Sequence, residues 1–215
     1  MTAAEDATAS AAVDTEEDLL WRWVDHIDGH GGAIPRPEWF ARAGELTVAE
    51  EITWFGMATA GAWWHGDLPS GVRKAPVYAG FHRHQEDGGP PVARVSVVVV
   101  PLADPARIVA ADWGDGYGGY EPAPVEGYAV LCSPPFDPSS VAGRDAEADL
   151  REARRVIAAG DHEGRRANYA EIVTDPDREG NVLFFPVVGE ERDGYEVKEQ
   201  DGTVVCVAFT AHDFD

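Results

Sequence analysis

From Pro76 onward the sequence is divided into short runs rich in valine and aromatic residues, separated by glycine, proline and aspartate. Residues of the first kind are enriched in strands, and those of the second kind favour turns. The pattern therefore predicts a multi-stranded antiparallel sheet. The strands are expected near residues 77–83, 92–100, 106–111, 126–132, 168–173, 181–188, 194–198 and 203–210.

Two further features refine this β-rich region. Asp201-Gly202 lies between the last two expected strands and predicts a hairpin, because both positions tolerate a positive φ. A helix is expected at about 144–159, where acidic residues come early and arginines late. That order complements the helix dipole.

The first third of the chain differs from the rest and predicts helices. Residues 1–14 contain almost no large apolar side chain and are expected to form a disordered tail. One helix is expected to begin after Thr15 and to end near Gly29, and a second to run from Thr47 to about Trp63. The predicted fold class is thus α+β, with an antiparallel sheet or sandwich over about 76–215 and the N-terminal helices packed on it. A single globular domain is expected over 15–215, with a tryptophan-rich helical part at 15–66.

The charge of the chain limits the partners that it can have. Arginine and lysine number 17 against 39 acidic residues, which gives a formal net charge of −22. A field of that sign repels phosphate backbones, so direct nucleic-acid binding is disfavoured. The acidity has two interpretations: solubility or adaptation to high salt, and a surface complementary to a basic protein partner.

Cysteines and apolar stretches point to a protein of the cytoplasm. Cys132 and Cys206 are the only cysteines, too few for a disulfide framework or a zinc quartet, and both are expected to be buried free thiols. The longest apolar stretch, 95–102, is far shorter than the roughly 20 residues of a membrane helix. The N-terminus has no basic or apolar block of a signal peptide.

Six of the seven tryptophans fall in the first third of the chain, among them Trp54, Trp63 and Trp64. Aromatic faces give a flat or sugar-like ligand a large contact area, so these side chains are candidates for a pocket lining. The alternative is that they form a core between the helices and the sheet.

A glycine-rich segment at 112–120 contains Asp112, Trp113 and Asp115. It lacks the Lys-Ser/Thr and the helix start of a phosphate-binding loop. It is interpreted either as a ligand-facing loop or as an ordinary connection between strands.

His82 and His84 are spaced by two residues, which places two imidazoles on one face of a strand, as a metal site requires. No third ligand follows at a recognised spacing, so a surface face without metal is expected. No cofactor motif is present in the sequence, and no cofactor is expected.

Arginines are concentrated between residues 144 and 166, which hold six of the fifteen. Because guanidinium groups grip carboxylate or phosphate with two parallel hydrogen bonds, Arg151, Arg154 and Arg155 are candidates for an anion or partner site. The alternative is pairing with neighbouring acids, such as Glu147 with Arg151 at i, i+4.

The C-terminal motifs are Gly180-Asn181-Val182-x-Phe184, Asp193-Gly194-Tyr195-x-Val197 and Asp201-Gly202-x-Val204-Val205, closing on Asp213-Phe214. This pattern resembles the ending of an uncharacterised bacterial family defined by a domain of unknown function. The resemblance extends over the last two-thirds of the chain. The family usually shows Gly-Trp-Gly-Asp-Gly before the tyrosine, where this chain has Gly189 to Gly194. No established activity comes with the family, so the resemblance implies a β-rich fold and nothing about chemistry.

Two functions remain after these exclusions. The leading hypothesis is a non-enzymatic acidic protein that binds a basic protein partner, like an immunity protein or an inhibitor that imitates nucleic-acid charge, because the sequence has no recognisable catalytic motif. The alternative is a small enzyme or ligand-binding domain with an aromatic-lined pocket. That alternative would use His82, His84, Asp112 or Asp115. The oligomeric state stays open.

Overall fold

The fold is described from a computed structural model of the chain. The residues that the structure describes are 16–29, 34–49, 51–54, 68, 71, 73–85, 88–114, 117–118, 127–189 and 193–211.

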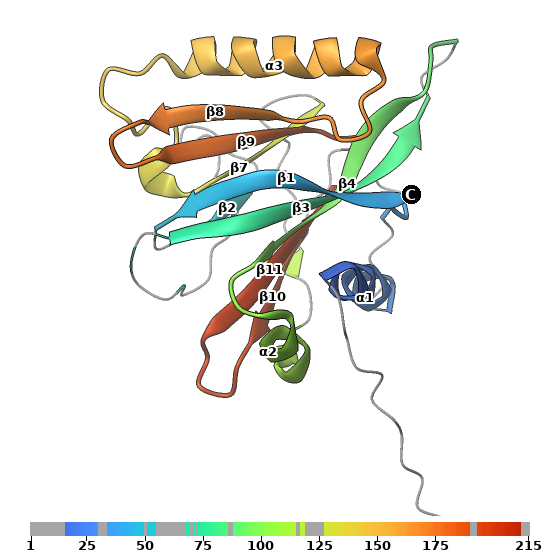
Figure 1. Ribbon diagram of the computed structural model, residues 1–215, viewed down its shortest axis with the longest axis vertical. Coiled ribbons are helices and arrows are strands. Elements are labelled where there is room, and N and C mark those ends of the chain that lie inside the picture. The colour runs from blue at the N-terminus through green and yellow to red at the C-terminus, as the bar shows by residue number, and fades with distance from the viewer. Residues whose placement is uncertain are drawn as a thin grey trace, which may run out of the picture.

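Two antiparallel sheets make up the β-structure of the described residues (Figure 1). Sheet A has the order β1 (Trp39–Val48), β3 (Arg73–His84), β4 (Val92–Pro101), β11 (Val204–Thr210), β10 (Asp193–Lys198) and β5 (Asp112–Trp113), with β6 (Tyr117–Gly118) also paired to β10. Sheet B has the order β2 (Thr53–Trp54), β7 (Tyr128–Cys132), β9 (Gly180–Pro186) and β8 (Ala170–Asp175).

Helices cover the outer faces of the two sheets. Helix α1 (Glu16–Gly29) and the short α2 (Pro105–Ala110) lie against sheet A, and α3 (Ala146–Glu163) lies along sheet B (Figure 1). A short 3-10 helix, η1 (Pro134–Phe136), follows β7. The fold therefore has four layers, with one apolar core between the sheets and a further core under the helices on each side.

Strand β4 shows how one sequence pattern serves two cores. Successive strand residues point to opposite faces. Val98 and Val100 thus enter the core between the sheets, whereas Val97 and Val99 pack on the side of α1. Because both faces of the strand are buried, its valines run without the polar alternation of a half-exposed strand.

Asn181 of β9 joins the two sheets through its side-chain amide. Its Oδ1 accepts from the backbone N–H of Thr47 at 2.9 Å, and its Nδ2 donates to the backbone carbonyl of Glu45 at 2.7 Å and to Glu171 Oε1 at 2.7 Å. Asn181 is only 4% exposed. It therefore fixes the end of β1, in sheet A, onto a strand of sheet B.

Ser133 holds the backbone of the segment that directly follows β1. Its Oγ accepts from the backbone N–H of Ala49 at 3.0 Å and donates to the backbone carbonyl of Glu51 at 2.6 Å. Ala49 and Glu51 lie where the chain passes from β1 to β2. Ser133 thus gives one backbone group of each residue a hydrogen-bond partner.

The α+β fold class is confirmed, with helices packed on antiparallel sheet. Seven of the eight expected strands are present, and the helix expected at 144–159 is α3. Asp145 caps α3 by accepting from Ala148 N–H at 3.0 Å, and Gly164, at φ 63°, ends it. The expected hairpin is also present, although only Gly202 has a positive φ, of 87°.

The prediction of a second N-terminal helix, from Thr47 to about Trp63, is wrong for those residues of the range that the structure describes. Thr47 and Val48 end β1, where they pair with Lys74 and Arg73, and Thr53–Trp54 form β2. Their apolar spacing fits a helix, but pairing with distant strands overrides that local preference. Of the two expected N-terminal helices, the described residues contain only α1.

The strand expected at 106–111 is also wrong, because this segment forms α2. Pro105 occupies the first turn of the helix, where its missing N–H costs nothing and its fixed φ suits a helix. The expected tail at 1–14 lies outside the described residues, and a single domain over 15–215 stays a prediction.

Replacing Asn181 by alanine should lower the free energy of unfolding by about 2 kcal/mol or more. The change removes three hydrogen bonds and leaves the buried N–H of Thr47 unpaired. Urea denaturation followed by circular dichroism measures the change. The control is Gln200→Ala at the exposed turn between β10 and β11, which should stay within about 0.5 kcal/mol of the wild type. Equal stabilities of the two variants would contradict the role of Asn181.

Candidate functional site

A groove of about 850 Å³ lies between α2 and the turn that joins β10 to β11. Its apolar lining is small, consisting of alanine side chains of α2 and Ala111 after it. Its polar lining includes Asp112 of β5 and, from the hairpin turn, Glu199 and Asp201. We call this hollow, bounded by Ala106–Asp112 and Glu199–Asp201, the α2 groove.

Among the described residues that line the α2 groove, Arg107 is the one basic residue, and it is already paired. Its Nε and Nη2 donate to Glu199 Oε1 and Oε2 at 3.0 and 2.7 Å. Hydrogen bonding by Arg107 lowers the pKa of Glu199 and keeps that carboxylate charged. The guanidinium therefore neutralises one of the three carboxylates that line the groove.

The other two carboxylates of the α2 groove are exposed. Asp112 and Asp201 form no ion pair within the part of the chain that the structure describes. Asp201 accepts a hydrogen bond from the backbone N–H of Thr203 at 2.9 Å, and this bond lowers the pKa of the Asp201 carboxyl. Three carboxylates face one guanidinium, which leaves the groove negative.

Local structure places these acids together. Asp112 lies opposite Lys198 in the short β5–β10 pairing, directly before the hairpin turn. In that turn the N–H of Gly202 donates to the carbonyl of Glu199 at 2.9 Å, which folds Asp201 back toward β10. The acids come from segments nearly 90 residues apart in the sequence. They lie together because β5 pairs with β10 and the hairpin turn directly follows β10.

Trp113 neighbours Asp112 but does not line the α2 groove. Its ring packs against Trp23 of α1, with centroids 4.5 Å apart, and against His26 at 5.3 Å. Its Nε1 donates to the carbonyl of Ile108 at 3.0 Å. Trp113 thus anchors β5 to both helices and supports the position of Asp112.

Trp54 is completely buried in the core between the sheets. Its ring stacks on Phe209 with centroids 5.7 Å apart, and its Nε1 donates to the carbonyl of Thr210 at 3.1 Å. For Trp54 the core interpretation is the one that the structure supports. Trp63, Trp64 and Asp115 lie outside the described residues.

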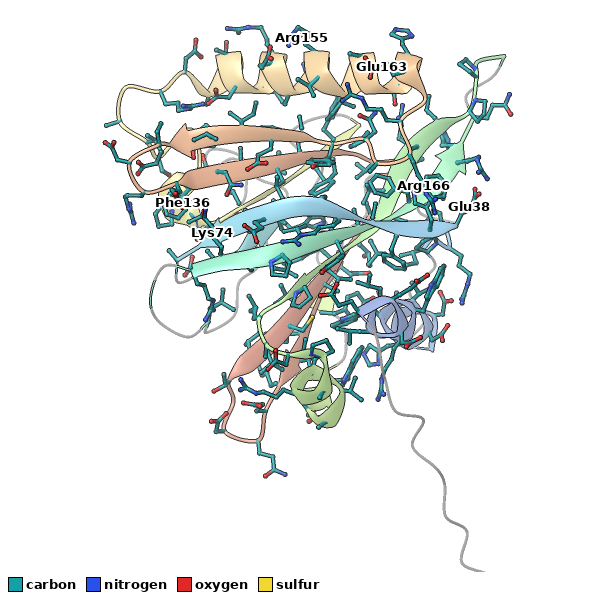
Figure 2. The ribbon with its side chains drawn as sticks, viewed as in Figure 1. Glu38, Lys74, Phe136, Arg155, Glu163 and Arg166 are labelled. Atoms are coloured by element: carbon teal, nitrogen blue, oxygen red, sulfur yellow. The ribbon has the colours of Figure 1, made fainter. Side chains whose placement is uncertain are left out.

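The candidate arginines of α3 are engaged with neighbouring groups. Arg155, on the side of α3 that faces away from sheet B in Figure 2, forms two hydrogen bonds with Glu152, at 2.8 and 2.6 Å. Arg151 lies within 3.6 Å of Glu147, the expected i, i+4 pair. The guanidinium of Arg154 lies 5.7 Å from the ring centroid of Tyr128. Arg151 and Arg155 are thus paired with carboxylates of α3, whereas Arg154 contacts an aromatic ring.

His82 corrects the expectation of a surface histidine pair. It is 9% exposed, and burial, together with the nearby His84, lowers its pKa. In the described ranges no three histidine, cysteine, aspartate or glutamate side chains gather as metal ligands would. The two cysteines are buried free thiols, as expected, and burial raises the pKa of each to about 12.

A cleft of about 450 Å³ that the sequence does not reveal lies where the C-terminal end of α3 meets β1, β3 and β4. We call it the Trp39 cleft, after one of its lining residues. The guanidinium groups of Arg83 and Arg166 lie 5.3 and 5.7 Å from the ring centroid of Trp39. Figure 2 shows Arg166 and Glu38 close together at this end of β1. Trp39 and Arg166 are 127 residues apart, so no local motif could signal the cleft.

Comparisons with protein-family models, with curated proteins and with solved structures found no significant match to this chain. The resemblance of its C-terminal motifs to an uncharacterised bacterial family stays a prediction. Among the helices of the described residues, none is long and apolar enough to cross a membrane.

Because His82 is buried, we expect the free energy of unfolding to depend on pH in a specific way. Its pKa is lowered in the folded protein, so as the pH falls below about 6.5 the unfolded chain takes up the proton first. The free energy of unfolding should therefore fall more steeply between pH 7 and pH 5 in the wild type than in His82→Gln. Urea denaturation across this pH range measures both slopes.

The matched control is His162→Gln, which changes an exposed histidine at the end of α3. This variant should keep the wild-type pH dependence. If His82→Gln shows the same change of unfolding free energy with pH as the wild type, His82 does not contribute to that pH dependence.

Proposed function

We propose that this protein is a non-enzymatic binding protein whose acidic surface engages a basic protein partner, in the manner of an immunity protein or of an inhibitor that imitates nucleic-acid charge. The observation that carries the proposal is the α2 groove, where Asp112, Glu199 and Asp201 meet around a single arginine. The formal charge of −22 supports it.

The pairing of basic residues strengthens this interpretation. Many arginines already form ion pairs with carboxylates of the same chain, so they are engaged before any partner arrives. These arginines are Arg36, Arg42, Arg83, Arg94, Arg107, Arg144, Arg151, Arg155, Arg165 and Arg178. Because acidic residues exceed basic ones by 22, a large carboxylate surplus remains to attract a partner of opposite charge.

The α2 groove has the shape and charge to receive a basic side chain. The alanine side chains leave room for an approaching arginine or lysine. Asp112 and Asp201 supply carboxylate acceptors that form no ion pair with the described residues. Stable protein interfaces bury about 800 Å² on each partner, so the groove would be one contact within a wider acidic surface. Its charge would speed association and fix the orientation of the partner.

A ligand-binding role is the second candidate, and one observation favours it. Beside the Trp39 cleft, Arg166 lies against the aromatic ring and forms no ion pair with the residues that the structure describes. An aromatic ring with adjacent guanidinium groups suits a small anionic molecule. Trp54, by contrast, is packed in the core and does not support an aromatic-lined pocket.

The experiment starts from a partner isolated with the purified protein, identified and purified itself. Replacing Asp112 by lysine should then weaken binding about tenfold or more, because it places a like charge against the basic partner. Titration calorimetry at low salt measures the dissociation constants.

The matched control is Asp177→Lys in the turn between β8 and β9, which changes the net charge equally on an exposed residue outside the groove. It should weaken binding much less. Equal losses in the two variants would place the contact elsewhere, and wild-type binding unchanged from low to high salt would contradict the electrostatic proposal.

A further inference from the structure

A pocket of about 370 Å³ lies among the first turns of α1, the start of β3 and the segment that joins β4 to α2. Leu19, Leu20 and Leu102 give it apolar walls, and Arg73 is one of its polar lining residues. We call it the Arg73 pocket. Its volume is in the range of small-molecule sites in proteins.

Arg73 has two buried donors without an acceptor. Its Nε and Nη2 atoms have no hydrogen-bond partner among the residues that the structure describes. Burial lowers the pKa of this guanidinium. Leaving charged donors buried and unpaired is costly, so a partner for them would stabilise the folded protein.

The two atoms belong to one edge of the guanidinium, where the N–H bonds are parallel and match two oxygens of a carboxylate or phosphate. Three other arginines of this chain show what that edge binds. Each donates through Nε and Nη2 to the two oxygens of one carboxylate, at 2.6 to 3.0 Å. The pairs are Arg107 with Glu199, Arg144 with Asp149 and Arg155 with Glu152.

The other charged groups of the Arg73 pocket are of both signs. Lys74 and Arg107 line it along with Arg73, against the two carboxylates of Glu16 and Asp104. Lys74 pairs with Glu179 outside the pocket, and Arg107 with Glu199. The hydroxyl of Tyr78 donates to Glu16 Oε2 at 2.6 Å. Arg73 is thus the cation of this lining that forms no ion pair with the residues that the structure describes.

We propose that the Arg73 pocket binds a small organic oxyanion, a carboxylate or a phosphate, whose two oxygens accept from Nε and Nη2 of Arg73. The leucine side chains would contact the apolar body of the ligand. Since these two atoms are buried in this structure, the proposal requires the Arg73 side chain to turn toward the ligand on binding. This site is independent of the binding of a basic partner proposed above.

The test compares anions at constant ionic strength, with chloride as the reference. Inorganic phosphate and succinate are the two probes, and they distinguish the phosphate source from the carboxylate source. At about ten times its dissociation constant, a bound anion should raise the midpoint of thermal unfolding of the wild type by about 3–5 °C. A rise with either probe supports the site and identifies its chemistry.

Three variants assign the effect to Arg73. Arg73→Gln should abolish the rise, and Arg73→Lys, which keeps the charge but lacks the two-donor edge, should weaken it strongly. Arg42→Gln, at an exposed arginine of the adjacent β1, should keep the full rise. The proposal is overturned when neither probe stabilises the wild type beyond chloride, or when Arg73→Gln or Arg73→Lys responds like the wild type.

Discussion

The fold depends on the hydrogen bonds by which Asn181 and Ser133 hold the step from β1 to β2. At this step the chain leaves sheet A and enters sheet B within four residues, in surroundings where its backbone groups cannot find strand partners. Asn181 binds Thr47 and Glu45, and Ser133 binds the backbone on both sides of the step. With the two sheets fixed in this way, one apolar core fills the space between them.

This arrangement decides which parts of the surface can carry a function. Each sheet is covered on its inner face by the other sheet and on its outer face by helices. The described hollows consequently lie at sheet ends, turns and helix termini, as the α2 groove and the Trp39 cleft do. Such sites combine residues far apart in the sequence, supported by a rigid scaffold. The acidic character of the α2 groove follows from two exposed aspartates that form no ion pair with the residues that the structure describes.

The sequence predicted those elements whose local pattern and tertiary environment agree. The Asp201-Gly202 turn and the helix predicted from the charge order of α3 are present, as are seven of the eight strands predicted from the valine-rich runs. The eighth, at 106–111, forms α2 instead. Residues 47–54 have apolar spacing that suits a helix as well as a strand. Pairing with distant strands decides between the two, because Thr47 and Val48 pair with β3 and Thr53–Trp54 pair with β7. Asp112 was a candidate from the sequence, but its neighbour Asp201 appeared only as a turn residue. Their proximity depends on the β5–β10 pairing, which no local motif encodes.

The proposed function requires that the surplus negative charge of the protein attract a basic partner. The most direct test is the association rate constant of the protein with its purified partner, measured by stopped flow across a range of ionic strengths. Electrostatic steering predicts a fast rate constant at low salt that falls steeply as salt screens the carboxylates, while the dissociation rate changes much less. An association rate constant that stays the same from low to high salt would show that the carboxylate charge does not steer the partner.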